Sequence, residues 1–328
     1  WMRVYKQTNK QIDMKNKLLA VLATLSMVAS ASAVKVNDNL SINGFIDGSY
    51  ASTDNGITKN QSLEVDEVEL NFVTNVGNVS SLIAVDASLD GNDSGDTGLG
   101  IEQAHFTYNI NDAVSITFGR YGSALGFERE DPAGLYTYSR AYLPGNGFNL
   151  GDVDTNAVDG LTIAYTGDAY SVAVSLENQV GEEWDLESND LDFEISFSYT
   201  GIEGLNIGGG FLVDNEELAA DETDVVNVNL SRQFGKLLVA GEYTELSADA
   251  GDRDAYLVLA DYDVNNKLGV ALRISSEELA GNAGDYDKVT IAPNYAITES
   301  LGAILEYSDV DNGGTDSEEY AVELTYTF

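Results

Sequence analysis

The sequence predicts an all-β fold, a transmembrane, antiparallel, up-and-down β-barrel of about sixteen strands. Three observations predict it. Apolar and polar residues alternate with a period of two along most of the chain, short and long connections follow one another, and an export signal lies near the N-terminus. Outside that signal, no apolar segment reaches the roughly 20 residues that a membrane-spanning helix needs.

The export signal reads MKNKLLAVLATLSMVASASA. A basic start, a short apolar run and a small-residue cleavage site follow one another, which is typical of a secretory signal peptide. We therefore interpret residues 14–33 as the signal peptide and residues 34–328 as the barrel. Residues 1–13 are interpreted as an upstream extension outside the fold.

The composition limits what the mature chain can do. The sequence has 16 basic and 55 acidic residues, a formal net charge of −39, and no cysteine. A nucleic acid partner is excluded because phosphate binding needs a basic surface. Thiolate catalysis and thiolate metal sites are excluded too, and we expect no cofactor. Abundant glycine (32) and scarce proline (3) suit many strands joined by turns.

The strands are recognised by one apolar and one polar face. Residues 191–199 place Leu, Phe, Ile, Phe and Tyr on one face against Asp, Glu and Ser on the other. Residues 170–177 and 267–274 alternate in the same way. The last stretch, EEYAVELTYTF at 318–328, is again apolar on one parity and polar on the other. In a membrane barrel the apolar parity faces lipid and the polar parity faces the lumen.

The connections fall into two classes that alternate along the chain, which predicts short turns at one end of the barrel and long loops at the other. Short turns are expected at 75–80, 109–114, 166–170, 200–204, 234–236, 264–267 and 297–300. Long loops are expected near 51–61, 90–100, 122–156, 179–189, 214–222, 247–252, 277–284 and 310–317. Seven short and eight long connections join about sixteen strands.

The barrel must close on itself, because every backbone group in lipid needs a hydrogen-bond partner. We expect the strand that ends at Phe328 to pair with residues 40–50. Two places break the strict alternation. Val65 and Val68 can share a face only if a bulge lies between them. Arg120 follows an apolar parity that points outward, yet we expect it to line the lumen, since an outward arginine at the bilayer midplane costs about 2–4 kcal/mol.

Three stretches carry a family resemblance: IEQAHFTYNI at 101–110, FGRYGSALGFE at 118–128 and LYTYSRAYL at 135–143. They resemble the OmpL-like outer-membrane β-barrel family of putative porins and the general sixteen-stranded bacterial porins. The terminal Tyr-x-Phe resembles the C-terminal signature of Gram-negative outer-membrane barrels. The resemblance implies a diffusion channel in which the third external loop, 122–156, folds into the lumen and narrows it. It also implies a homotrimer, lumen placement of Arg120, and recognition of Phe328 by the assembly machinery of the outer membrane.

Charge at such a constriction selects ions, because low-dielectric walls focus the field of the lining residues. Acids outnumber bases, so we expect a cation-preferring, non-enzymatic pore for small hydrophilic solutes in the outer membrane of a Gram-negative bacterium, in contact with lipid and lipopolysaccharide. The expected pore residues are Arg120, Glu128, Arg129, Glu130, Asp131, Arg140, Asp192, Glu194, Glu242, Arg273 and Lys288. Further lumen-parity residues are Asp86, Glu177, Lys267, Glu306 and Glu323.

Three other interpretations fit parts of the sequence. A substrate-specific channel would use the tyrosine-rich 135–142 segment as a stacking or sugar-binding surface. A closed barrel would act as an adhesin through its acidic loops, and a secreted soluble β-protein would show the same alternation. His105, the single histidine, faces the lumen by parity but lacks a catalytic motif beside it. Residues 90–98 resemble a calcium loop, but the closing glutamate, Glu102, is one position off, so metal-free turns are favoured.

Overall fold

The structure is a computed structural model, and it describes residues 33–88, 99–129, 131–150, 157–179, 191–214, 223–248 and 251–328. The expected upstream extension and nearly all of the expected signal peptide lie outside these residues, as does the expected calcium-like loop at 90–98. Among the described residues, no helix combines the length and the apolar character needed to span a membrane.

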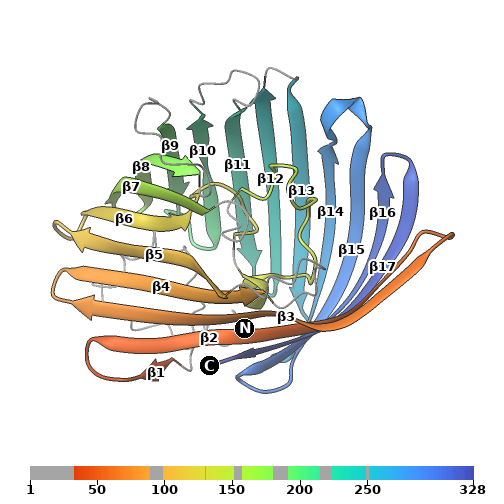
Figure 1. The fold of residues 1–328 in the computed structure, drawn as a ribbon, viewed down its shortest axis with the longest axis horizontal. Helices are drawn as coiled ribbons and strands as arrows, with labels where there is room; N and C mark the ends of the chain where they lie inside the picture. Colours follow the sequence, from red (N-terminus) through yellow and green to blue (C-terminus); the bar gives the residue numbers. More distant parts are fainter. Residues whose placement is uncertain are drawn as a thin grey trace.

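The described chain is built almost entirely from strands (Figure 1). A two-residue strand, β1 (Val34–Lys35), precedes the long ones. These are β2 (Leu40–Asp54), β3 (Lys59–Val76), β4 (Val79–Ser88), β5 (Leu99–Asn109), β6 (Val114–Gly122), β7 (Ala157–Thr166), β8 (Tyr170–Gln179), β9 (Asp192–Tyr199), β10 (Leu205–Val213), β11 (Thr223–Phe234), β12 (Leu237–Ala248), β13 (Arg253–Asp263), β14 (Leu268–Glu278), β15 (Asp285–Ala296), β16 (Leu301–Asn312) and β17 (Thr315–Thr327). Two short 3₁₀ turns, η4 (Pro132–Gly134) and η5 (Ala280–Asn282), lie in connections.

The strands β2 to β17 form a closed antiparallel barrel in which each strand pairs with its neighbours in sequence and β17 pairs with β2. This confirms the predicted fold of sixteen barrel strands and the predicted closing partner. At the seam Phe328 donates its N–H to the Gly44 carbonyl at 3.0 Å, and Gly44 donates to the Phe328 carbonyl at 3.1 Å. The ring of Phe328 stacks on Tyr326 with centroids 5.9 Å apart.

The turns at one end agree with the prediction, but two connections at the other end do not. All seven expected short turns separate consecutive strands. The long loops expected near 51–61 and 310–317 are short instead. Strand β2 ends only at Asp54 and β3 already begins at Lys59, and only Gly313 and Gly314 separate β16 from β17. Polar residues at these tips keep the strand pairing, since backbone hydrogen bonds of a hairpin do not depend on apolar side chains.

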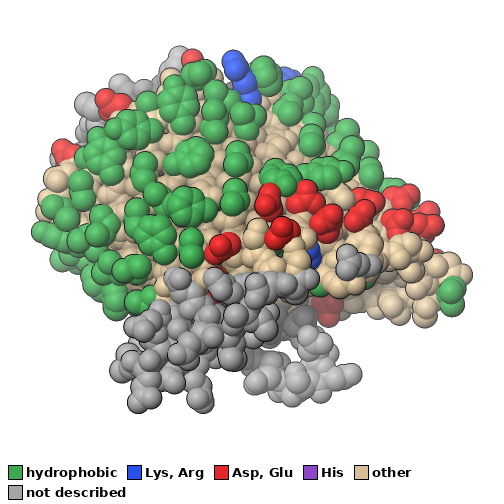
Figure 2. Space-filling view, turned by 90° about the horizontal axis from the view of Figure 1, so that it is seen from above, with side chains coloured by type: hydrophobic (Ala, Val, Ile, Leu, Met, Phe, Trp, Pro, Cys, Tyr) green, Lys and Arg blue, Asp and Glu red, His purple; other side chains and the backbone are tan. Residues whose placement is uncertain are grey.

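The two faces of the barrel differ as the alternation predicts. Along β17, Tyr320, Val322, Leu324 and Tyr326 are exposed on the outside, whereas the intervening Glu323 is buried inside. Figure 2 shows a wide apolar surface with acidic side chains gathered along one edge. Such an apolar belt with a polar border matches the lipid-facing surface of an outer-membrane barrel.

Two register shifts interrupt the alternation. The pairing of β2 with β3 shifts between Asp47 and Gly48, which makes Asp66 the extra residue of β3. This is the bulge predicted between Val65 and Val68. A second shift, between β4 and β5, makes Glu102 the extra residue of β5 and was not predicted. A bulge places two consecutive residues on the same side of a strand, so Glu102 is buried beside Gln103.

Candidate functional site

The barrel interior is occupied by the lumen loop, which we define as residues 123–150 without residue 130. Its path inside the strands is visible in Figure 1. Inward side chains from five strands contact it: Glu194 on β9, Glu242 on β12, Glu277 on β14, Glu306 on β16 and Ser49 on β2. The loop therefore crosses the lumen, as the resemblance implied.

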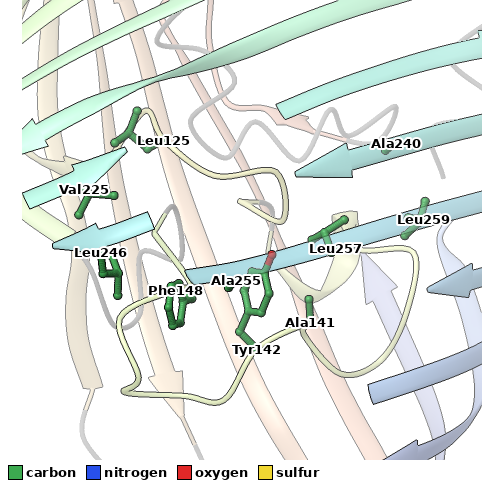
Figure 3. Close-up of a cluster of buried hydrophobic side chains, with 10 residues drawn as sticks. All are labelled: Leu125, Ala141, Tyr142, Phe148, Val225, Ala240, Leu246, Ala255, Leu257 and Leu259. Carbon is green, nitrogen blue, oxygen red and sulfur yellow. The ribbon is translucent and has the colours of Figure 1, made fainter. Parts of the chain in front are cut away.

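An apolar seat holds one side of the lumen loop. Leu125, Ala141, Tyr142 and Phe148 of the loop pack in one buried cluster with inward residues of β11 to β13 (Figure 3). The strand residues are Val225, Ala240, Leu246, Ala255, Leu257 and Leu259. Burying a side chain such as leucine or phenylalanine contributes about 1.5–3 kcal/mol. The seat therefore fixes this side of the loop against β11 to β13.

Arg273 on β14 joins the loop to the wall with charge as well as hydrogen bonds. Its guanidinium is fully buried and forms an ion pair with Glu128, with Nη1 and Oε1 2.6 Å apart. It also donates to Thr137 Oγ1 at 2.7 Å, to Ser139 O at 2.8 Å and to Arg140 O at 2.8 Å. A planar guanidinium suits such a set of diverging acceptors. The positive charge of Arg273 is therefore compensated by Glu128 of the loop.

Several inward carboxylates hold loop backbone in the same way. Glu194 accepts a hydrogen bond from the Ala124 N–H at 3.1 Å and another from the Ser123 hydroxyl. Glu277 accepts from the Leu143 N–H at 2.9 Å, and Glu306 accepts from the Ser139 N–H at 3.2 Å. Buried carboxylates need such donors. These acids position the loop.

The acidic wall lies elsewhere, on the strands around the seam. We define it as Asp47 on β2, Glu67 and Glu69 on β3, Glu102 on β5 and Glu323 on β17. All five point inward and are at most 9% exposed. Within strands β2 to β5, as the structure describes them, the only lysine or arginine is Lys59, at the exposed start of β3. This part of the lumen is therefore lined by several carboxyl groups, with no buried base on strands β2 to β5 as described.

A carboxylate group links the acidic wall to the lumen loop. Glu69, Glu102 and Asp131 each bring one oxygen within 4.8 Å of the other two, and all three residues are buried. Oxygen ligands suit Ca²⁺ and Mg²⁺. These three residues are therefore where a divalent cation could be held among the described residues.

The structure brings most of the expected pore residues together. Glu128, Arg129, Asp131 and Arg140 lie on the lumen loop, and Arg140 donates to the Glu128 carbonyl at 2.7 Å. The inward faces of the strands carry Asp192, Glu194, Glu242, Arg273 and Lys288. Lys288 pairs with the inward Glu319 on β17 at 2.9 Å. Glu130 lies outside the described residues.

Two basic residues lie elsewhere than expected. Arg120 follows Phe118 on the outward parity of β6, with no register shift between β6 and its neighbours. It forms an ion pair with Asp159 on β7, with Nε and Oδ1 3.0 Å apart, two residues from the end of β6. The large cost of an outward arginine applies at the bilayer midplane. The ion pair with Asp159 and the position near the loop end of β6 remove that cost for Arg120. Lys267 lies in an exposed turn, above the Tyr295 ring at 5.9 Å.

His105 faces the lumen on β5, and its ring meets the Tyr121 ring edge-on with centroids 6.2 Å apart. Among the hydrogen bonds of the described residues, neither ring nitrogen of His105 has a partner, so no carboxylate or nucleophile is paired with it there. We therefore interpret His105 as part of the barrel wall.

Sequence reasoning missed the apolar seat and the bulge at Glu102. The seat has a visible signal: residues 255–260 read AYLVLA, which is apolar on both faces. A strand that is apolar on its inward face needs apolar cover there, and the lumen loop supplies it. The bulge at Glu102 has no comparable signal in the sequence. Ile101 and Ala104 flank it, and both side chains fit either face of the strand, so the alternation looks the same with or without a bulge.

The first prediction concerns Tyr138, whose hydroxyl shares a 3.0 Å hydrogen bond with Ser49 Oγ. Burial raises the pKa of Tyr138 to about 12. An undocked tyrosine ionises near pH 10, so the docking of this side chain is favoured fully below pH 10 and loses strength as the pH rises to 12. We expect Tyr138→Phe to remove one phenolate absorbance step near pH 12 from the titration at 295 nm. In urea-unfolded protein the same substitution should remove a step near pH 10, and a loss near pH 10 in the folded protein would contradict the docking.

The comparisons with known proteins agree with this geometry. A family model described as Gram-negative porin matches residues 19–327. No curated protein sequence matches the chain. Among solved structures, OmpF of Salmonella typhi, in complex with daunomycin, is similar with a TM-score of 0.70 and 14% identity, covering 90% of this chain and 100% of that one.

Two further structures share the fold. The outer-membrane channel DcaP of Acinetobacter baumannii has a TM-score of 0.66 and 15% identity, with 90% of this chain and 100% of that chain covered. An anion-selective porin from Comamonas acidovorans has a TM-score of 0.61 and 12% identity, with 88% and 99% covered. At such low identity the likeness establishes the barrel fold.

Proposed function

Because the chain belongs to the Gram-negative porin family and is an outer-membrane channel, we propose that it is a passive diffusion pore for small hydrophilic solutes and ions, with a preference for cations. The lumen loop supplies the constriction. The proposed pore carries out no reaction and uses no cofactor.

The acidic wall carries this proposal. Its five carboxylates are buried together, and a buried negative charge is costly unless a proton or a cation compensates it. Two buried bases on the strands are engaged elsewhere: Arg273 binds Glu128 and Lys288 binds Glu319. Rings of carboxylate favour cations at a channel constriction. The fold itself does not set the sign, since the Comamonas acidovorans porin of the same fold is anion-selective.

The proposal extends to the surroundings of the barrel. We propose a homotrimer in contact with lipid and lipopolysaccharide, and recognition of Phe328 by the assembly machinery. One of the similar structures, OmpT of Vibrio cholerae, is described in a trimer form. The export signal at residues 14–33 belongs to the same proposal, because an outer-membrane protein has to cross the inner membrane first.

The test is the reversal potential of the purified, refolded protein in a planar bilayer under a KCl gradient. We expect stepwise conductance and a reversal potential of the sign that cation selectivity gives. An anion-selective reversal potential would overturn the charge argument. Protein that is shown to be folded and inserted but gives no conductance would overturn the pore itself.

The second prediction removes charge from the acidic wall. We expect the double substitution Glu69→Gln and Glu102→Gln to move the reversal potential toward zero, because two focused negative charges are lost. The effect should shrink above about 1 M salt, where the Debye length falls to about 3 Å. Asp309→Asn is the control, since Asp309 is exposed on the outside of β16. An equal effect of the control would locate the selectivity outside the lumen.

A further inference from the structure

A cavity lies between the lumen loop and the inward faces of β8 to β11, and we propose that it is a binding subsite for neutral polyhydroxylated solutes such as sugars. Several wall residues lie near the strand ends next to the short turns: Ser171 is the second residue of β8, Ser198 is the last but one of β9, and Asn206 is the second of β10. The cavity is therefore in the half of the lumen next to the short turns. This inference rests on the proposed diffusion function, because solutes reach the cavity through the pore.

The strand side of the cavity offers uncharged hydrogen-bonding groups only. They are the hydroxyls of Ser171, Ser196, Ser198 and Ser231 and the amides of Asn206 and Asn229. A hydroxyl donates and accepts, and an amide does both at separate atoms. This mixture matches the hydroxyl groups of a sugar, each of which also donates and accepts. It offers no charge that would favour an ion over a neutral solute.

The glycine at position 208 leaves room for the amide of Asn229 at this wall. A Cβ at Gly208 would lie 2.8 Å from Asn229 Oδ1, closer than real Cβ atoms approach. Asn229 Nδ2 donates to Asn227 Oδ1 at 3.2 Å, which orients the amide. The amide oxygen of Asn229 is thereby held at the cavity wall by its neighbours on β10 and β11.

The loop side of the cavity adds an aromatic surface and one cation. Phe127 and Tyr136 line it, and both also pack against the apolar seat. Aromatic faces offer apolar contact to the C–H face of a sugar ring, and Tyr136 adds a hydroxyl. Of the two charged residues that line the cavity, Glu128 is neutralised by Arg273. Arg129 contributes a guanidinium, which donates hydrogen bonds to hydroxyl oxygens.

The strand lining of the cavity differs from the acidic wall in its charge. The wall on β2, β3, β5 and β17 carries five carboxylates, whereas the strand lining of the cavity carries none. In a chain with a formal charge of −39, this strand lining offers a neutral solute hydrogen bonds without a carboxylate at the cavity wall.

The experiment measures binding and conductance separately. Saturation-transfer NMR with maltose and with a polyethylene glycol of similar radius is recorded on the refolded protein in detergent micelles. We expect transfer to maltose and none to the polymer. In the bilayer we expect maltose, and not the polymer at equal concentration, to reduce the ion current with saturation.

The variants locate the site. Asn206→Ala and Asn229→Ala should each weaken maltose binding by about fivefold, as expected for one lost hydrogen bond. Asn43→Ala is the matched control, because Asn43 is an inward asparagine on β2, across the lumen. Folding of each variant is checked by its heat-dependent mobility in gels, and a variant that fails this check is replaced by Ser231→Ala.

Each outcome decides one claim. Conductance without saturable maltose binding would overturn the subsite and leave the diffusion pore standing. Maltose binding that Asn43→Ala weakens as much as Asn229→Ala would also overturn the subsite. Absence of conductance would overturn the proposed function, whatever the NMR shows.

Discussion

Replacing Arg273 by alanine is expected to release the lumen loop and enlarge the pore. The substitution leaves Glu128 buried without its ion-pair partner, and it removes the donors to Thr137, Ser139 and Arg140. Breaking a buried ion pair by removing one partner costs about 3–5 kcal/mol. Since about 1.4 kcal/mol is a factor of ten, the docking equilibrium of the loop should shift by about a hundredfold or more.

The measurement is single-channel conductance in a planar bilayer, together with the size limit for uncharged polymers. We expect larger and noisier current steps and entry of larger polymers. Lys288→Ala is the matched control, because Lys288 is also a buried inward base but pairs with Glu319 on β17 and not with the loop. Unchanged conductance in Arg273→Ala would show that the apolar seat alone holds the loop. In that case Leu257→Ala, which makes the seat smaller, should have the larger effect.

Gly44→Ala is expected to destabilise the barrel, although glycine to alanine in a strand usually stabilises by about 0.5–1 kcal/mol. A Cβ at Gly44 would overlap the carbonyl oxygen of Glu69 and come within 3.1 Å of the Phe328 ring. The strands around the seam would have to separate, which weakens the two hydrogen bonds between Gly44 and Phe328. Overpacking of this kind costs about 1–3 kcal/mol.

Gly241→Ala on β12 provides the control, because the nearest atom to its added Cβ is Leu257 O at 3.6 Å, an ordinary contact. The two variants are compared by the temperature at which the folded form disappears in heat-modifiability gels. We expect a lower temperature for Gly44→Ala and an unchanged or higher one for Gly241→Ala. If both behave alike, the tight seam at Phe328 has no influence on stability.

Most of the fold could be predicted from sequence because alternation is a local property. Tyr320, Val322 and Leu324 alternate with Glu323 and Thr325 in the sequence, and the same parity separates outside from inside in the barrel. The bulge at Asp66 could be predicted for the same reason, since apolar residues on both sides of it are out of phase. The pairing of β17 with β2 could be predicted because the barrel has to close.

The inner arrangement could not be predicted as well, because it depends on contacts between distant residues. Arg120 and Asp159 are 39 positions apart, and only the pairing of β6 with β7 brings them together outside the barrel. The role of Arg273 could not be read from its parity, which shows an inward base but not that Glu128 of the loop lies against it. The predicted length of the loop at 310–317 was also wrong, because this polar sequence continues as paired strand in β16 and β17.

The bulges at Asp66 and Glu102 have a consequence for how this chain can change in length. Removing one residue from a regular strand turns every later side chain to the other face. Removing a bulge residue instead restores ordinary pairing and leaves the facing of the neighbouring residues as it was. Deletion of Asp66 or Glu102 therefore removes one acidic residue while the lipid-facing surface stays intact.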